Sequence, residues 1–145
     1  MFKNTFYQLK HLKTLSIAVV IACLASCGQT VRFATSTVVP AAEGKVKLHK
    51  DKNQNYEVDI SITNLAEPQR LTPPRKTYVV WMYNQENQAK NLGQLTTSSG
   101  LFSNTLKAEF KTVTPIKPKR IFITAEDTGT PDAPSSLTVL NTDSF

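Results

Sequence analysis

The chain has 145 residues, the length of one domain, with 19% charged residues and a formal net charge of +6. Residues 1–26 contain Lys3, Lys10 and Lys13 but no acid, which leaves 14 basic and 11 acidic residues and a charge of about +3. So small a charge does not favour nucleic acid as a partner, and we expect none.

Residues 1–26 have the pattern of a signal peptide. Their lysines precede residues 15–24, a nearly unbroken apolar run that is too short to cross a bilayer, which takes about 20 residues. A charged start, a short apolar core and small residues after it are typical of a secretory signal that is removed. We therefore expect residues 1–26 to be absent from the mature protein.

The end of this segment, Leu24-Ala25-Ser26-Cys27, resembles the lipobox of bacterial lipoproteins. The resemblance implies that Cys27 receives a diacylglyceryl group, that cleavage separates Ser26 from Cys27, and that the new amine is acylated. Each buried CH₂ of such chains contributes about 0.8 kcal/mol to membrane binding. An ordinary signal peptide, or a short membrane anchor with an incidental cysteine, is the alternative. Beyond these covalent groups we expect no cofactor and no metal.

The residue after Cys27 is Gly28. In Gram-negative lipoproteins an aspartate there commonly retains the protein in the inner membrane, so the resemblance implies a lipid anchor in the cell membrane, with the outer membrane favoured. Cys23 and Cys27 are the two cysteines of the chain. With none after Cys27, the mature domain has neither a disulfide nor a cysteine-based zinc site.

Residues 27–40 are expected to be the lipidated cysteine and a tether that runs into a first strand near residues 32–39, and residues 41–145 to be the folded domain. Residues 45–48 and 56–63 alternate between apolar and polar side chains around a turn at residues 51–55, which indicates a β-hairpin. Residues 77–83 are the most hydrophobic run and indicate a central strand buried on both faces.

Further short strands are expected at residues 91–95, 101–110, 120–125 and 137–140, with a turn at residues 98–100. Residues 120–125 are strongly apolar. In residues 101–110, the candidates to face inwards are Phe102, Thr105 or Leu106, and Phe110. Seven or eight short strands predict an all-β fold, an immunoglobulin-like antiparallel β-sandwich with Trp81 in its core. Burial alone must stabilise it, which is feasible for about 105 residues.

Three segments of the second half resemble the C-terminal extracytoplasmic domain of anti-sigma-K-type factors. They are residues 78–81 (Tyr-Val-Val-Trp), residues 91–95 (Asn-Leu-Gly-Gln-Leu) and residues 121–127 (Ile-Phe-Ile-Thr-Ala-Glu-Asp), with Pro131 and Pro134 following. The resemblance implies a fold and a sensing or scaffolding role outside the membrane. It does not imply binding of a sigma factor, which those proteins bind with a separate cytoplasmic domain.

Titratable side chains give weak indications of chemistry. His49 is expected to be a surface residue, and Glu57 and Asp59 are expected to oppose Lys45 and Lys47 across the hairpin. The lysines at positions 45, 47, 50 and 52 are interpreted as the solvent face of a strand, with a weak patch for anionic lipid or polysaccharide as the alternative.

The loop near residue 130 has three acids, Glu126, Asp127 and Asp132, that could bind calcium, although calcium takes more oxygen ligands than this loop offers. Aromatic residues 78, 81 and 83 could stack on sugars if exposed, but Trp81 in an apolar run favours the core. Ser98 and Ser99 lack the setting of a nucleophile.

The sequence therefore predicts a lipid-anchored, non-enzymatic binding or scaffolding module of the cell envelope. Its partner would be the membrane, through the anchor, and an envelope protein or polysaccharide. One alternative is an extracytoplasmic sensor in stress signalling. A further one is an envelope enzyme with a site on the loops of residues 84–90 and 126–134.

Overall fold

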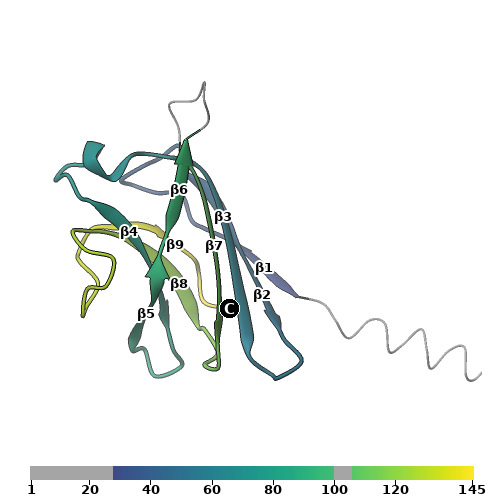
Figure 1. Cartoon of the computed structure of the whole chain (residues 1–145). Coiled ribbons are helices and arrows are strands. Elements are labelled where there is room, and N and C mark those ends of the chain that lie inside the picture. The colour runs from purple at the N-terminus through teal and green to yellow at the C-terminus, as the bar shows by residue number, and fades with distance from the viewer. Residues whose placement is uncertain (1–27, 100–105) are drawn as a thin grey trace, which may run out of the picture.

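The computed structural model describes residues 28–99 and 106–145. Two antiparallel sheets pack face to face as an all-β sandwich, which confirms the predicted fold class (Figure 1). The strands of this part of the chain are β1 (Gln29–Arg32), β2 (Glu43–Lys50), β3 (Tyr56–Leu65), β4 (Thr77–Tyr83), β5 (Ala89–Gln94), β6 (Thr96–Ser99), β7 (Leu106–Thr114), β8 (Arg120–Glu126) and β9 (Thr138–Asn141). They number nine, where seven or eight were expected.

One sheet has the strand order β1-β2-β3-β7-β6 and the other the order β5-β4-β8-β9. Leu95 alone separates β5 from β6, so the chain passes from one sheet to the other at this residue. A short 3₁₀ helix, η1 (Pro68–Arg70), lies between β3 and β4. No helix in residues 28–99 or 106–145 is long and apolar enough to cross a membrane.

The main core lies between the two sheets and follows the two-residue period of the strands. On β3 the inward side chains are Val58, Ile60 and Ile62, each at most 2% exposed. On the facing sheet β4 and β8 contribute Tyr78, Val80, Met82, Ile121 and Ile123 to the same cluster. Burying a side chain of this size contributes about 1.5–3 kcal/mol, so these central strands hold the two sheets together.

The N-terminal part of the domain differs from the prediction. β1 pairs with β2 inside the expected tether of residues 27–40, and Phe33 forms a bridge to Thr142 on the other sheet. Beyond it the hydroxyl oxygen of Ser36 accepts hydrogen bonds from the backbone N–H groups of residues 38 and 39. Residues 28–40 therefore belong to the folded domain. The expected strand at residues 32–39 is wrong, because Val38 and Val39 lie in a turn that the Ser36 side chain stabilises.

The strands around residue 100 also differ. Thr96–Ser99 is strand β6, where a turn was expected to begin at residue 98, and β7 (Leu106–Thr114) covers the described part of the strand expected at residues 101–110. Phe102 and Thr105 lie outside the described residues, whereas Phe110 is half-buried and packs on the main core. β6 has no apolar residue, so periodicity could not indicate it. Its pairing with β7 holds it in place.

Tyr78 links the core to the loop before β4. Its side chain is 1% exposed and its hydroxyl donates a hydrogen bond of 2.9 Å to the carbonyl oxygen of Ala66. Burial raises the pKa of the Tyr78 hydroxyl well above its ordinary value, because ionisation would place a charge in the core.

We expect Tyr78→Phe to lower the free energy of unfolding by about 1 kcal/mol at neutral pH, since it removes one buried hydrogen bond. A raised pKa in the folded state stabilises the fold fully below the unfolded pKa of about 10, and this contribution is lost as the pH rises above it. Wild-type stability should therefore fall more steeply above about pH 10 than that of the variant. Urea unfolding at several pH values measures both effects. The same dependence of stability on pH in the wild type and in Tyr78→Phe would contradict a buried Tyr78 hydroxyl.

Candidate functional site

The predicted lipidation and cleavage residues Leu24, Ala25, Ser26 and Cys27 lie outside the described residues. The described chain begins at Gly28 and enters β1 one residue later. A Cβ atom on Gly28 would lie 3.2 Å from the Cβ atom of His49, which places Gly28 beside the end of β2. Consecutive Cα atoms are about 3.8 Å apart, so the residue before Gly28 is joined to the folded domain without an intervening linker.

His49 is paired with an acid across the first hairpin. Its Nε2 atom lies 2.9 Å from the Oε2 atom of Glu57, and the two residues are direct partners in the register of β2 and β3. The imidazole is 44% exposed. This geometry is that of a cross-strand pair on the solvent face of the sheet, as expected of a surface histidine.

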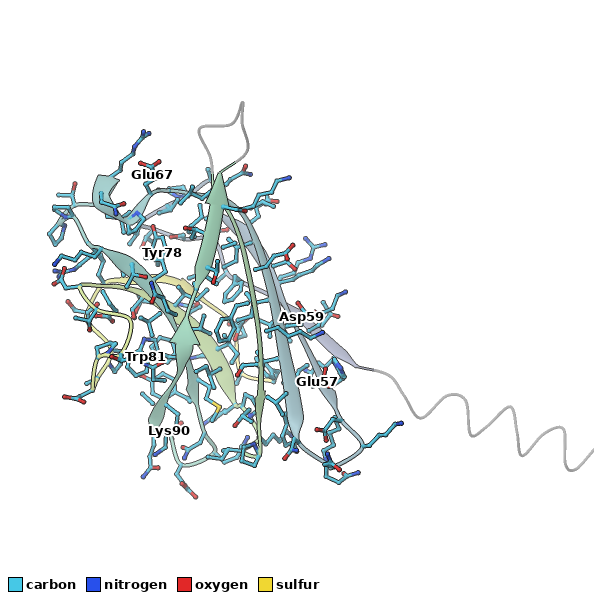
Figure 2. The ribbon with its side chains drawn as sticks, viewed as in Figure 1. Glu57, Asp59, Glu67, Tyr78, Trp81 and Lys90 are labelled. Carbon is cyan, nitrogen blue, oxygen red and sulfur yellow. The ribbon has the colours of Figure 1, made fainter. Side chains whose placement is uncertain are left out.

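The expected pairing of acids with lysines holds for one of the two acids. Asp59 lies opposite Lys47, but Glu57 lies opposite His49, and the partner of Lys45 is Ser61. Figure 2 labels the two acids, Glu57 and Asp59. The turn at residues 51–55 sets this register.

Asp51 fixes that turn with its carboxylate. One oxygen accepts hydrogen bonds from the backbone N–H groups of Asn53 and Asn55, at 2.7 and 2.9 Å. Desolvation acts to raise the pKa of Asp51, but the hydrogen bonds from Asn55 and Asn53 outweigh it and lower the pKa below its ordinary value. The side chain therefore holds the turn as a carboxylate at neutral pH.

The three acids near residue 130 do not converge on a cation. Glu126 is 5% exposed and its Oε1 atom accepts a hydrogen bond from the backbone N–H of Ser135. Asp127 points elsewhere and pairs with the guanidinium of Arg75 at 3.0 Å, while Asp132 is exposed. Within residues 28–99 and 106–145 no three His, Cys, Asp or Glu side chains are grouped as metal ligands. The calcium interpretation of this loop is not supported by its geometry.

The aromatic residues of β4 lie on two different faces. Tyr78 belongs to the core between the sheets, whereas Trp81 belongs to a second apolar cluster with Val79 and Phe122. The indole and the ring of Phe122 stack with centroids 6.2 Å apart. Trp81 is 1% exposed, so it is buried as predicted. It lies on the outer face of its sheet, however, and not between the two sheets. It is therefore not available to stack on a sugar.

Tyr83 extends this outer cluster towards the end of the sheet. Its ring stacks on Phe122 at 4.8 Å, and the guanidinium of Arg120 lies over it at 4.8 Å. Arg120 and Tyr83 are direct partners in the register of β4 and β8. This cation–π contact covers the outer face of the sheet near the last residue of β4.

A buried polar network lies on the same outer face near the first residue of β4. The indole N–H of Trp81 donates a hydrogen bond of 2.8 Å to the hydroxyl of Thr124, which in turn donates to the Oε1 atom of Glu126. The same oxygen accepts the backbone N–H of Ser135 from the loop between β8 and β9. We call Trp81, Thr124, Glu126 and Ser135 the Glu126 network. It ties the loop to the sheet through one carboxylate.

The loop of residues 127–137 crosses the outer face of the four-stranded sheet. It leaves β8 at Glu126, and at Gly129 it comes close to the side chain of Gln94 on β5. β4 lies between β8 and β5, so the loop passes over β4 before it returns to Ser135 (Figure 1). This cover explains how a tryptophan on an outer face is excluded from water. The alternation of Phe122, Thr124 and Glu126 along β8 was the sequence signal that could have placed these side chains on one face.

In comparisons with protein-family models, curated proteins and solved structures, none matches this chain. The resemblance to anti-sigma-K-type factors therefore stays a prediction. Its three segments lie on β4, β5 and β8, which are neighbours in one sheet.

The two loops considered for an enzyme site lie at opposite ends of the sandwich. Thr77, the first residue of β4, pairs with Glu126, whereas Tyr83, the last, leads into the loop of residues 84–88. Seven residues of strand separate the loops by about 20 Å. This is the separation of the two strand ends from which the loops start, and the enzyme alternative stays a prediction.

A cavity of about 560 Å³ lies near the point where the chain passes between the sheets. Its described lining includes Glu67, Lys76, Thr77, Gln94 and Thr96. The Glu67 carboxylate pairs with Arg70 at 3.1 Å, and Gln94 donates to the hydroxyl of Thr77 at 2.7 Å. Three of these polar side chains, Glu67, Thr77 and Gln94, are therefore engaged in contacts within the fold, as structural residues are.

Proposed function

We propose that this protein is a lipid-anchored, non-enzymatic binding or scaffolding module of the cell envelope. In this proposal residues 1–26 are removed, Cys27 carries the acyl groups, and the β-sandwich binds an envelope protein or polysaccharide. The outer membrane is the favoured location in a Gram-negative cell.

The observation that carries the proposal is the start of the fold. β1 begins two residues after Cys27, and its pairing with β2 needs nothing from residues 1–26. Cleavage before Cys27 would therefore leave every described strand in place. A cut further along the chain would remove β1 from the edge of its sheet.

Metabolic labelling with an alkyne fatty acid tests the anchor. We expect label to enter the wild-type chain and not Cys27→Ser, and the variant to leave the membrane fraction. Cys23→Ser is the matched control, because it changes the other cysteine of the chain and should be labelled like the wild type. Wild-type chain without label, or equal label in Cys27→Ser, would overturn the proposal.

The binding role is supported by the contacts of the chemically capable side chains. His49 is paired with Glu57, Asp127 and Glu67 form ion pairs with arginines, and Glu126 holds a loop. Each of these contacts has a structural explanation in the fold, which supports a binding module.

The strand order supports an immunoglobulin-type arrangement within this proposal. β2-β3-β7-β6 and β4-β8-β9 follow the order of the A-B-E-D and C-F-G sheets of that fold, with β1 and β5 added at the edges.

An extracytoplasmic sensor in stress signalling is the second candidate. The observation in its favour is that the segments resembling anti-sigma-K-type factors occupy neighbouring strands of one sheet. A sigma-factor gene beside the gene of this protein would favour this role.

A further inference from the structure

The two ends of the sandwich differ in charge. One end has the turns of residues 51–55, 84–88 and 115–119, and we call it the anchor end. Its basic residues are Lys50, Lys52, Lys90, Lys117, Lys119 and Arg120, and its acidic residues are Asp51, Glu57, Glu86 and Asp143. The opposite end has the loops of residues 66–76 and 127–137. Its basic residues are Arg70, Arg75, Lys76 and Lys107, and its exposed or half-buried acids are Glu43, Glu67, Asp127 and Asp132.

Register and hydrogen bonds place the turns of the anchor end together. Lys50 pairs with Tyr56 and Tyr56 with Thr114, which brings the first turn beside residues 115–119. Lys119 then donates through its Nζ atom to the Oδ1 atom of Asn87 at 2.7 Å, which joins residues 115–119 to the turn of residues 84–88. The basic residues therefore lie at the same end of the sandwich. Lys90 lies at this end in Figure 2.

Gly28 lies at the same end. It is beside His49, the residue before Lys50, and Gln29 pairs with Leu48. A lipid on the residue joined to Gly28 would therefore hold this end of the sandwich at the bilayer. There is no spacer that would let the domain stand away from the headgroups.

This end also has exposed apolar side chains. Ile116 is 40% exposed and Val113, which lies opposite Glu57 on β3, is 53% exposed, and these are the exposed large hydrophobic residues of the described chain. Ile116 lies between Pro115 and Lys117, at the tip of the connection from β7 to β8. An exposed aliphatic side chain flanked by lysines suits the boundary between headgroups and acyl chains, where lysine ammonium groups stay in water.

We infer that the anchor end is a second membrane-binding element, which docks on anionic phospholipid headgroups and inserts Ile116 at the interface. The inference rests on the proposed lipid anchor for its biological setting. Its chemistry is separate, because it needs no acyl group. A basic patch beside a lipid chain adds a second signal to membrane binding.

The test uses residues 28–145, which contain every described strand and both apolar clusters. We expect this acyl-free domain to cosediment with phosphatidylglycerol vesicles and not with phosphatidylcholine vesicles. Each lysine near an anionic surface is worth roughly fivefold in binding, so Lys52→Gln with Lys117→Gln should weaken it about 25-fold.

The matched control is Lys45→Gln with Lys76→Gln, which removes the same charge from exposed lysines more than about 15 Å from the anchor end. Screening at physiological salt limits their effect on the bilayer, since the Debye length is about 8 Å. We expect the control to bind like the wild type. Equal weakening of both double variants, or no binding of the wild type to phosphatidylglycerol, would overturn the inference.

The two proposals fail separately in these experiments. Vesicle binding by the acyl-free domain together with an unlabelled Cys27 would overturn the lipid anchor alone. A labelled Cys27 in a chain whose acyl-free domain ignores phosphatidylglycerol would overturn the docking surface alone.

Discussion

Trp81→Ala is expected to lower the free energy of unfolding by about 3–5 kcal/mol, the range for truncating a large buried ring. The substitution leaves a cavity beside Phe122 and removes the donor of the 2.8 Å hydrogen bond to Thr124. Small domains have about 5–15 kcal/mol in total, so a marginal fold would be lost. Urea unfolding followed by circular dichroism measures the loss, because Trp81 is the single tryptophan and its fluorescence disappears with it.

Trp81→Phe is the control for size and chemistry. It keeps an apolar ring to pack on Phe122 and removes only the indole donor and part of the volume. We expect a smaller loss, about 1–2 kcal/mol. A Trp81→Ala variant within about 1 kcal/mol of the wild type would contradict a buried indole under the loop of residues 127–137.

Glu126→Ala is expected to lower the free energy of unfolding by about 3 kcal/mol and to open the loop of residues 127–137. The substitution removes the acceptor of the Thr124 hydroxyl and of the backbone N–H of Ser135, and each hydrogen bond to a charged group is worth about 1.5–3 kcal/mol. Limited proteolysis reports the opening, and we expect cleavage within this loop to precede cleavage elsewhere.

Two control variants distinguish the loss of the Glu126 network from the loss of a negative charge in the same region. Asp132→Ala removes an exposed carboxylate from the same loop and should leave stability within about 0.5 kcal/mol of the wild type. Glu126→Gln keeps an acceptor oxygen and should lie between the two. Equal effects of Glu126→Ala and Asp132→Ala would show that the carboxylate does not hold the loop.

The central strands were predictable because the pattern of apolar side chains along each of them indicates which residues are buried. Residues 56–63 and 120–125 were expected as strands and lie in β3 and β8, and the strand at residues 77–83 is β4. β1 and β6 were missed or misplaced because each has at most one apolar residue. Such strands are held by backbone hydrogen bonds to a neighbour, which local sequence does not encode.

The position of Trp81 was not predictable, because both faces of β4 are apolar and no polar residue marks the solvent side. The role of Glu126 was missed for a different reason. It was interpreted as part of an acidic loop, although it continues the alternation of Phe122 and Thr124 along β8 and therefore turns towards the sheet. The predicted Cys27 anchor depends on a local motif alone, and for that reason sequence suffices to propose it.

Three of the outermost strands are short. β1 and β9 have four residues each and β5 has six, whereas the inner strands β3 and β7 have ten and nine. An exposed strand edge is a template on which another molecule can add a strand, and a short edge gives it few hydrogen bonds to make. Proteins held in a plane by lipid meet their own copies far more often than proteins in solution. If the proposed lipid anchor holds this protein at a membrane, the short edges would help it to remain separate from its own copies at high surface density.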